Sequence, residues 1–193
     1  MTHRKLTVLI TGATGGLGRA LCEYYSGPPS IIGHSVSLIV HGRDEKKLQA
    51  LYPNSTRIVA DLSEFSGIME LANKAAGMDI DILINNAAIT CPGLPLAEVS
   101  DKYINDSVNV NLLAPMLLSK HVAASVAKND GIIVNINSMV AAEPKKHRAT
   151  YTATKTGLRG FAESFRLSQL VTVLDVYPTN IKTHKDRENA MNL

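Results

Sequence analysis

The sequence predicts a doubly wound α/β domain, in which helices cover both faces of a parallel β-sheet of about six strands. Two observations support this prediction. Short apolar runs rich in β-branched residues alternate with longer segments of helical pattern from one end of the chain to the other. The apolar runs are also continuous and do not alternate with polar residues, which is typical of strands that are buried on both faces.

The predicted strands and helices follow one another in regular order. Each expected strand is a short run dominated by Val, Ile and Leu, and each expected helix carries apolar residues three or four positions apart. The expected strands are 6–10, 35–40, 56–61, 81–85, 131–137 and 171–177. The expected helices are 17–25, 44–51, 66–77, a segment around 109–127, and 151 to about 167. Residues 26–35 are rich in Pro and Gly and predict a long loop.

The size and composition of the chain fit one domain spanning residues 1–193. It has 193 residues, of which 45% are hydrophobic and 19% are charged. The net charge of +3 is small and the basic residues are scattered apart from a run at 145–148, so no nucleic-acid partner is expected. Cys22 and Cys91 lie in different elements, and no Cys or His cluster has metal-ligand spacing. These features favour a cytoplasmic protein without a structural metal.

No segment has the pattern of a membrane anchor. The apolar run 6–10 is too short for the core of a signal peptide and leads into a glycine turn. The most apolar later segment, 108–127, includes asparagine, proline, lysine and histidine, which argues against a bilayer span. We therefore expect a soluble protein with no membrane partner.

A glycine-rich turn, Thr11–Gly18, follows the first expected strand and opens the first expected helix. Gly12 allows a tight turn, Gly16 allows main-chain N–H groups to approach a phosphate, and Gly18 removes a side chain where helix and strand cross. The positive end of the helix dipole then faces the anion. Such a turn alone is a weak signal, because a simple tight connection looks the same. Its position between a strand and a helix favours a nucleotide.

The end of the second expected strand favours NADP(H) over NAD(H). Dinucleotide-binding folds usually place an acidic residue there, which binds the ribose 2′-hydroxyl group. Here Gly42 stands at that place and Arg43 follows it. A guanidinium group suits a 2′-phosphate, which an acidic side chain would repel. The alternative is that Arg43 is a solvated loop residue paired with Asp44.

Six motifs, in order along the chain, carry a resemblance to a known family. They are the turn at Thr11–Gly18, Asp61 after the third strand, Asn-Asn-Ala-Ala at 85–88, Asn111, Ser138, and Tyr151 with Lys155 in a Tyr-x-x-x-Lys pattern. Over nearly its whole length the chain resembles the single-domain branch of the short-chain dehydrogenase/reductase family. The resemblance implies a Rossmann-type fold, a nicotinamide cofactor and carbonyl–alcohol chemistry.

The resemblance also implies which residues hold the cofactor. Asp61 would bind the adenine amino group, the main chain from Asn85 to Ala87 would line the adenosine ribose, and Thr183 would hold the nicotinamide carboxamide. The full set of expected NADP(H) contacts is Gly12, Thr14, Gly16, Leu17, Gly18, Arg43, Asp61, Leu62, Asn85, Ala87, Tyr151, Lys155, Pro178, Ile181 and Thr183.

The expected catalytic residues are Asn111, Ser138, Tyr151 and Lys155. Hydride transfer to a carbonyl group leaves negative charge on oxygen, so a proton donor and a stabilising hydrogen bond are needed beside it. Tyr151 can give the proton, and Lys155, one helical turn away, can favour tyrosinate and bind the nicotinamide ribose. Ser138 can bond the same substrate oxygen, and Asn111 would carry a proton relay from Lys155 through water. Each residue alone has an ordinary structural explanation, but their joint pattern favours catalysis.

Three departures from the family's pattern concern the cofactor and substrate sites. Ala88 and Thr179 each stand where glycine is usual, and Thr179 narrows the main-chain conformations beside the nicotinamide. The sequence ends at Leu193, before the substrate-covering segment, helix and seventh strand of that family. The substrate site would then be open to water, closed by a partner subunit, or suited to a substrate that needs no lid.

The basic segment 143–148 lies between Ser138 and Tyr151, where the family places the rim of the substrate pocket. Its basic residues could attract an anionic substrate such as a carboxylate, a phosphate or a carrier-bound acyl group. A solvated loop or a subunit contact is the favoured alternative.

The leading hypothesis is an NADP(H)-dependent oxidoreductase that interconverts a carbonyl group and a secondary alcohol and works as a reductase. The alternative is a regulatory or assembly protein that binds NADP(H) with little or no catalysis, although the intact set of catalytic residues argues against it. An epimerase or dehydratase is less favoured, because the chain lacks a sugar-nucleotide domain. We also expect a homodimer or homotetramer, through an apolar stripe at 112–127 that would equally serve the core. The substrate itself stays open.

Overall fold

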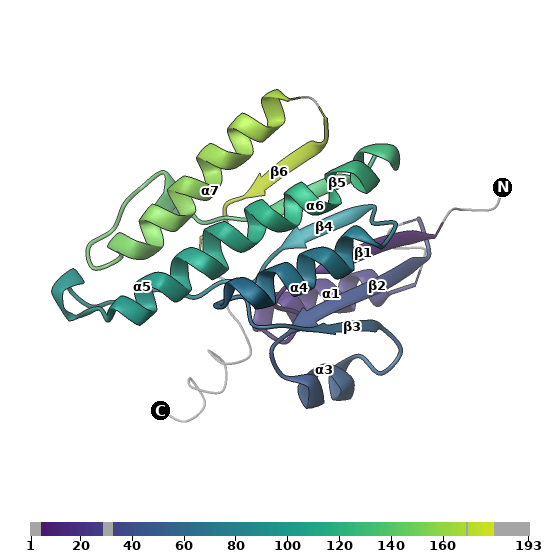
Figure 1. Cartoon of the computed structure of the whole chain (residues 1–193), viewed down its shortest axis with the longest axis horizontal. Helices are drawn as coiled ribbons and strands as arrows, with labels where there is room; N and C mark the ends of the chain where they lie inside the picture. Colours follow the sequence, from purple (N-terminus) through teal and green to yellow (C-terminus); the bar gives the residue numbers. More distant parts are fainter. Residues whose placement is uncertain (1–4, 29–32, 169, 180–193) are drawn as a thin grey trace.

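The computed structural model describes residues 5–28, 33–168 and 170–179. These residues form one parallel sheet of six strands in the order β3-β2-β1-β4-β5-β6 (Figure 1). The doubly wound parallel sheet predicted from the sequence is therefore confirmed. The strands are β1 Leu6–Ile10, β2 Val36–Gly42, β3 Thr56–Val59, β4 Ile82–Asn85, β5 Ile132–Ile136 and β6 Thr172–Val176.

Helical segments connect successive strands, because parallel strands need a crossover that returns the chain to the same edge of the sheet. The α-helices are α1 Gly16–Ser26, α3 Glu45–Leu51, α4 Phe65–Ala76, α5 Asp101–Val108, α6 Ala114–Lys128 and α7 Ala149–Leu167. Three shorter helical turns are η1 Leu96–Glu98, η2 Asn109–Leu113 and η3 Met139–Ala141, of which η2 is π-helical.

Two apolar layers hold the helices to the sheet, one on each face. On one face, α4, α6 and α7 cover the sheet (Figure 1), where Leu9 and Leu83 of the strands pack in one cluster with Leu118 of α6. On the other face, Val8 shares a cluster with Leu48 of α3. Val8 and Leu9 are neighbours that point to opposite faces, so β1 is buried on both sides, which explains its continuous apolar run.

The segments α5, η2 and α6 form one continuous helix from Asp101 to Lys128. The sequence pattern predicted a helix only around 109–127, because its first turns are largely polar. Ser100 caps the true start, accepting a hydrogen bond from the main-chain N–H of Tyr103 at 3.2 Å. The helix is long and apolar enough to cross a membrane by length and composition alone, but 50% of its most apolar window is buried inside the protein. Core helices of globular domains share these properties.

Strand β6 differs from the continuous buried strand that the sequence predicted. Its residues alternate between buried and exposed, with Val173 buried while Leu174 is 48% and Val176 is 38% exposed. β6 is the last strand of the sheet and has β5 as its only neighbour among the described strands. Burial on both faces therefore holds for the central strands, whereas β6 is covered on the face that meets α7.

The strand order places the candidate site. From β1 the sheet continues to β2 and β3 on one side and to β4, β5 and β6 on the other. The connections after β1 and β4 therefore diverge and leave a crevice at the carboxyl ends of these strands, which is where ligands bind in open α/β sheets.

Candidate active site

The glycine turn expected after β1 is present, and its packing explains two of its glycines. Gly12 has a φ of +66°, and a Cβ atom there would lie 2.8 Å from the Cα atom of Ala87. A Cβ atom at Gly18 would overlap the carbonyl oxygen of Gly12, so α1 packs directly against the turn. Gly16 begins α1 and is exposed. The N-terminus of α1 thus faces solvent beside a rigid turn, as the binding of a pyrophosphate requires.

Asn86 and Thr11 fasten the glycine turn to the end of β4, a role that the sequence analysis missed. Nδ2 of Asn86 donates to the carbonyl oxygens of Thr11 at 2.7 Å and Gly12 at 3.3 Å. The Thr11 hydroxyl accepts from the main-chain N–H groups of Asn86 at 2.9 Å and Ala87 at 3.0 Å. The available signal was the pair of asparagines after a buried strand, since amide side chains can satisfy the main-chain groups of a neighbouring turn.

The buried imidazole of His41, on β2, also supports the turn. Its Nδ1 accepts from the main-chain N–H of Gly12 at 3.3 Å, and its Nε2 lies 3.1 Å from the carbonyl oxygen of Ala60. An acceptor at Nδ1 requires the proton on Nε2, so the ring is neutral and donates to Ala60. Burial lowers the pKa of His41 to about 4, against the opposing effects of the hydrogen bond to Ala60 and the charge of Asp61.

The lowered pKa of His41 predicts a loss of stability in mild acid. The unfolded chain binds a proton at this imidazole below its ordinary pKa of 6.5, whereas the folded protein stays neutral there down to about pH 4. The free energy of unfolding therefore falls as the pH drops from 6.5 to 4. We expect this group to contribute a loss of about 2 kcal/mol between pH 7 and pH 5. Urea titrations of the wild type and of His41→Asn measure it; equal pH dependence in the two proteins would contradict the assignment.

Arg43 and Asp61 follow β2 and β3, where the sequence predicted the adenosine end of the cofactor site. Oδ1 of Asp61 accepts from the main-chain N–H of Ser63 at 2.9 Å and from its hydroxyl at 2.8 Å. Partial burial acts to raise the pKa of Asp61, but these hydrogen bonds and the charge of Arg43 outweigh it and lower the pKa below its ordinary value. Asp44 caps α3 by accepting from the N–H of Lys47 at 3.0 Å. Asp61 is thus an oriented, exposed carboxylate near the Arg43 guanidinium.

Tyr151 and Ser138 are brought together by α7 and the turn that follows β5. Ser138 caps η3, its hydroxyl accepting from the main-chain N–H of Val140 at 3.4 Å. Burial raises the pKa of the Tyr151 phenol above its ordinary value, while hydrogen bonding to Ser138 and the charge of Arg148 act in the opposite direction. The phenol is therefore neutral at neutral pH, which is the form that can donate a proton.

Lys155 is buried one turn after Tyr151 in α7, and is 2% exposed. Its Nζ donates to the carbonyl oxygen of Ile136 at 2.7 Å and lies 5.8 Å from the centroid of the Tyr151 ring. Burial lowers the pKa of Lys155 to about 8, an effect that Asp175 partly offsets. The sequence predicted that Lys155 would favour tyrosinate. Burial dominates the pKa of the Tyr151 phenol and raises it. The effect of Lys155 on that pKa stays a prediction.

Asn111 is fully buried in the π-helical turn η2. Its Oδ1 accepts from the main-chain N–H of Ile89 at 2.8 Å, and its Nδ2 donates to the carbonyl oxygen of Ile89 at 2.9 Å. The same Nδ2 donates to the hydroxyl of Thr154, the residue before Lys155, at 3.3 Å. Asn111 therefore clamps the segment after β4 to α7 beside Lys155. Its role in a proton relay stays a prediction.

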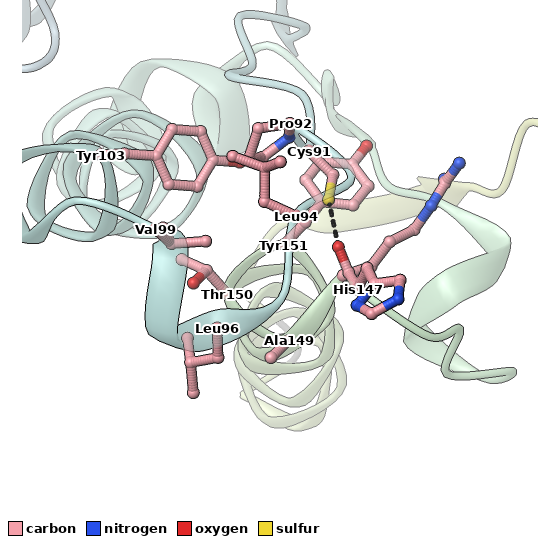
Figure 2. Close-up of a pocket in the computed structure, with 11 residues that line it drawn as sticks. Cys91, Pro92, Leu94, Leu96, Val99, Tyr103, His147, Ala149, Thr150 and Tyr151 are labelled. Atoms are coloured by element: carbon pink, nitrogen blue, oxygen red, sulfur yellow. Dashed lines mark hydrogen bonds between the residues drawn. The ribbon is translucent and has the colours of Figure 1, made fainter.

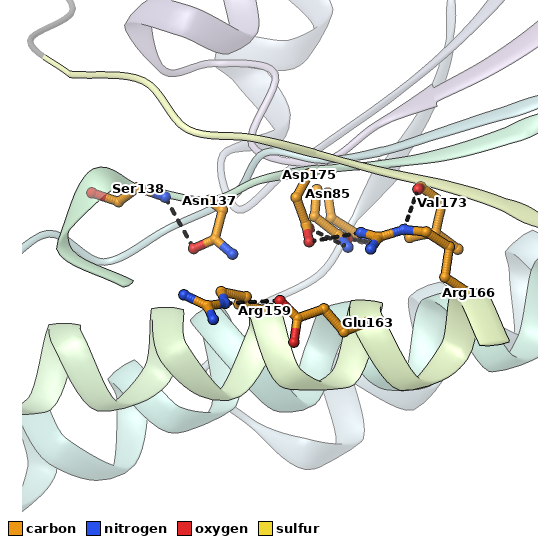
Figure 3. Close-up of polar contacts among 9 residues, drawn as sticks. Asn85, Asn137, Ser138, Arg159, Glu163, Arg166, Val173 and Asp175 are labelled. Carbon is orange, nitrogen blue, oxygen red and sulfur yellow. Dashed lines mark hydrogen bonds and ion pairs between the residues drawn. The ribbon is translucent and has the colours of Figure 1, made fainter. Parts of the chain in front are cut away.

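A row of polar side chains crosses β4, β5 and β6 at the same edge of the sheet (Figure 3). Asn85, Asn135 and Asp175 are register partners on these strands. Asn85 donates to Asn135 at 2.9 Å, Asn135 donates to Asp175 at 3.1 Å, and Arg166 of α7 pairs with Asp175 at 3.2 Å. The row ties the strands to α7. Because the Asn85 side chain is used inside the sheet, its expected cofactor contact can involve only its main chain.

A cavity of about 160 Å³ opens beside Tyr151 (Figure 2). One wall is formed by Leu94, Leu96 and Val99, from the connection between β4 and α5, and the other by the start of α7. Sγ of Cys91 joins the two walls by donating to the carbonyl oxygen of His147 at 2.8 Å. The cavity therefore has an apolar wall on one side and polar groups, the Tyr151 phenol among them, on the other.

The sequence analysis located the basic rim of this cavity but missed its apolar wall. His147 and Arg148 line the cavity, whereas Lys145 and Lys146 are exposed and do not. The segment 91–99 has neither strand nor helix periodicity, so its pattern did not distinguish it from an ordinary surface loop. Its signal was the presence of leucine and valine in a connection otherwise rich in Pro and Gly.

A model of the family described as short chain dehydrogenase matches residues 6–192. The chain belongs to the short-chain dehydrogenase family. This short-chain dehydrogenase is similar to the 3-oxoacyl-(acyl-carrier-protein) reductase FabG of Escherichia coli, with 32% identity over 189 residues that cover 93% of this chain and 75% of that protein. The resemblance predicted from the six sequence motifs is thereby confirmed at the level of the family.

Solved structures of other dehydrogenases are also similar. One is an enzyme from Sphingobium yanoikuyae in complex with NADPH, which is 28% identical, has a TM-score of 0.80, and is matched over 92% of this chain and 72% of that one. Another is a bulky-bulky ketone specific alcohol dehydrogenase from Comamonas testosteroni, with 28% identity and a TM-score of 0.81 over 93% of this chain and 77% of that one. The Rossmann-type fold is therefore shared with known oxidoreductases.

The remaining predicted cofactor residues of this short-chain dehydrogenase divide into three groups. Thr14 and Leu17 lie partly exposed at the glycine turn and in the first turn of α1, and Leu62 is buried, so any contact from Leu62 would come from its main chain. Pro178 follows β6 and is partly exposed. Ile181 and Thr183 lie outside the described residues.

Ala88 and Thr179, the two departures from glycine, are exposed and can be accommodated without crowding the core. Within the described ranges, no three His, Cys, Asp or Glu side chains form a metal site.

Proposed function

We propose that this protein is an NADP(H)-dependent oxidoreductase that interconverts a carbonyl group and a secondary alcohol, working as a reductase. The observation that carries the proposal is the neutral phenol of Tyr151, which lines a cavity with one apolar wall and has Ser138 and the ammonium group of Lys155 nearby. A proton donor held beside the substrate oxygen is what the reduction of a carbonyl group requires.

The residues of the described chain fit a phosphorylated dinucleotide. The open N-terminus of α1 and the rigid glycine turn suit the pyrophosphate, and the oriented carboxylate of Asp61 suits the adenine amino group. Arg43 suits a 2′-phosphate, since no acidic residue occupies the end of β2. The NADPH complex of the Sphingobium relative supports this choice. When bound, the cofactor supplies the hydride, and the protein supplies placement and electrostatics.

Each of the four predicted catalytic residues then has a distinct task. Tyr151 donates the proton to the carbonyl oxygen, and Ser138 bonds the same oxygen and orients it. The positive charge of Lys155 stabilises the phenolate that Tyr151 becomes after it has given its proton. Both amide atoms of Asn111 are engaged by Ile89, so a relay of protons at Asn111 would use its main-chain carbonyl group rather than its side chain.

The cavity favours carbonyl substrates with an apolar body. Leu94, Leu96 and Val99 offer an apolar wall beside Tyr151, and an apolar group placed there gains about 0.8 kcal/mol for each buried methylene. His147 and Arg148 are the basic residues that reach the cavity, so an anionic group on the substrate would meet these two. The ketone-specific alcohol dehydrogenase of Comamonas is consistent with an apolar carbonyl substrate. The 3-oxoacyl-(acyl-carrier-protein) reductase of Escherichia coli is consistent with a carrier-bound one.

We further place the protein in the cytoplasm as a homodimer or homotetramer. Cys22 and Cys91 are free thiols in the structure, which suits a reducing compartment. Val108 of α5 and Met116 of α6 are exposed apolar side chains on the long helix, where a second copy could pack.

Replacing Arg43 tests the cofactor assignment. In Arg43→Leu we expect the Kd for NADPH to rise about 30-fold, because a charge-assisted hydrogen bond to the 2′-phosphate is lost, while the Kd for NADH stays within about twofold. Fluorescence titration with both cofactors measures this. Lys46→Leu, which removes an exposed cation from the nearby helix α3, is the matched control and should bind NADPH as the wild type does. An equal loss for NADH and NADPH in Arg43→Leu would refute the assignment of Arg43 to the 2′-phosphate.

A further inference from the structure

One buried titratable side chain, His41, has no part in the chemistry proposed above. It is the second-last residue of β2 and is 2% exposed. Polar groups inside a sheet are costly unless they are hydrogen-bonded, and both ring nitrogens of His41 are bonded. The two partners are Gly12, in the glycine turn, and Ala60, the residue after β3. One imidazole ring thus bridges two separate segments that follow different strands.

We propose that His41 is a positioning residue for the dinucleotide: its neutral imidazole holds the glycine turn and the residue before Asp61 in one fixed arrangement. The inference rests on the proposed function, because it takes the glycine turn to bind the pyrophosphate and Asp61 to bind the adenine. Unlike the predicted catalytic and cofactor-binding residues, His41 would touch neither the cofactor nor the substrate. It would set the distance between two groups that bind the cofactor.

The bond to Gly12 acts where the turn has least freedom to compensate. Gly12 adopts a left-handed conformation, and a Cβ atom at Gly12 or at Gly18 would overlap neighbouring main-chain atoms, so the turn is tightly packed here. Its N–H points to Nδ1 of His41, and the next N–H, that of Ala13, donates to the main-chain oxygen of His41 at 2.8 Å. Two successive N–H groups of the turn are therefore bonded to the same residue, and these bonds help to fix the position of the start of α1.

The bond to Ala60 acts on the adenine end. Nε2 of His41 donates to the carbonyl oxygen of Ala60, and the N–H of Ala60 donates to the main-chain oxygen of Gly42 at 3.2 Å. Both polar groups of the Ala60 main chain are thus tied to the end of β2. Asp61 follows at once, and its carboxylate is oriented in turn by Ser63. A shift of Ala60 would carry Asp61 with it.

Three substitutions separate the two bonds. In asparagine the carboxamide oxygen can occupy the place of Nδ1, so His41→Asn can keep the acceptor for Gly12 but does not reach Ala60. In glutamine the amide nitrogen reaches the place of Nε2, so His41→Gln can keep the donor to Ala60 but leaves the Gly12 N–H without its acceptor. His41→Leu keeps the bulk and loses both bonds. His121→Leu, on α6, is the matched control for replacing a histidine by leucine.

The test is the binding of 2′-phospho-ADP-ribose, which carries the adenosine and pyrophosphate groups without the nicotinamide, measured by titration calorimetry on the folded full chain. We expect the Kd to rise about tenfold in His41→Leu, because one buried donor and one buried acceptor lose their partners. The Kd should rise about threefold in His41→Asn and in His41→Gln, each of which restores one bond. The Kd of His121→Leu should equal that of the wild type. Amide hydrogen exchange of Gly12 in the ligand-free protein gives a second readout, since exchange should be faster in His41→Leu and His41→Gln than in His41→Asn.

Each outcome bears on one proposal. If the wild type binds 2′-phospho-ADP-ribose and all folded His41 variants bind it equally well, His41 has no positioning role and the proposed function stands. If His41→Leu does not fold, the ranking of His41→Asn and His41→Gln against the wild type decides, and equal Kd values for all three overturn the inference. If the wild type itself binds neither 2′-phospho-ADP-ribose nor NADPH, the proposed function is overturned instead.

Discussion

Replacing the phenol of Tyr151 by a phenyl ring, Tyr151→Phe, is expected to lower kcat about 10³-fold, with the Kd for NADPH changed by no more than about threefold. The change deletes one oxygen atom from the cavity wall and leaves the ring in place. Without a proton donor, the developing alkoxide has only Ser138 to stabilise it. Steady-state rates with an apolar ketone and direct cofactor titration measure the two quantities separately.

The matched control for this variant is Tyr24→Phe, which removes the hydroxyl group of an exposed tyrosine on α1. It should keep the wild-type kcat. A Tyr151→Phe protein that is folded, binds NADPH and turns over within about threefold of the wild type would show that Tyr151 is not the acid.

Lys155→Met should have opposite effects on activity and stability. We expect kcat to fall about 10²-fold or more, because the charge that stabilises the phenolate of Tyr151 is lost. The fold should become more stable, since the pKa of Lys155 is depressed from 10.5 to about 8, which means that burial of its ammonium group opposes folding at pH 7. Removing that charge gains about 3 kcal/mol, and the lost hydrogen bond to Ile136 costs about 1 kcal/mol.

The sign of the stability change distinguishes this account from a structural role for Lys155. A gain of about 2 kcal/mol corresponds to a rise in Tm of about 4–8 °C for a domain of this size. Thermal unfolding of Lys155→Met and of Lys120→Met, a replacement of an exposed lysine on α6, gives the comparison. Retained activity, or a Tm below that of the wild type, would contradict the role assigned to the buried ammonium group.

The fold could be read from the sequence because its strands are buried on both faces. β1 and β2 are continuous apolar runs, and their length, their composition and the helical patterns between them determine the sheet. The edge strand β6 was the exception, because an apolar sequence does not tell whether helices cover one face of the strand or both. The start of α5 was missed for the related reason that an exposed first turn carries no apolar stripe.

The candidate site could be predicted from the sequence only where its residues recur at a fixed spacing. Tyr151 and Lys155 lie one helical turn apart, and the glycines of the turn recur at set intervals. The hydrogen-bond partners of the site residues are distant in the sequence, so no fixed spacing indicates them. His41 meets Gly12 across 29 positions, and Asn111 meets Thr154 across 43. Such contacts depend on the order of strands in the sheet, which the three-dimensional structure supplies.

The apolar wall of the cavity was not predicted from the sequence, for another reason. The segment that carries Leu94 and Leu96 has no regular structure apart from the short turn η1, so its apolar residues follow no period. A loop with two exposed leucines beside Tyr151 is informative once the fold has placed it there. Loops that cover a site therefore reveal substrate preference only after their position is known.

The most direct test of the central claim is turnover itself. Purified protein is mixed with NADPH and a panel of ketones and aldehydes grouped by charge and apolar size, with Tyr151→Phe as the blank, and both NADPH oxidation and alcohol formation are followed. The account predicts equimolar alcohol formation with apolar carbonyl compounds and none above background in the blank. Tight NADPH binding without any alcohol above the Tyr151→Phe background would contradict it and would favour a protein that senses NADP(H) rather than uses it.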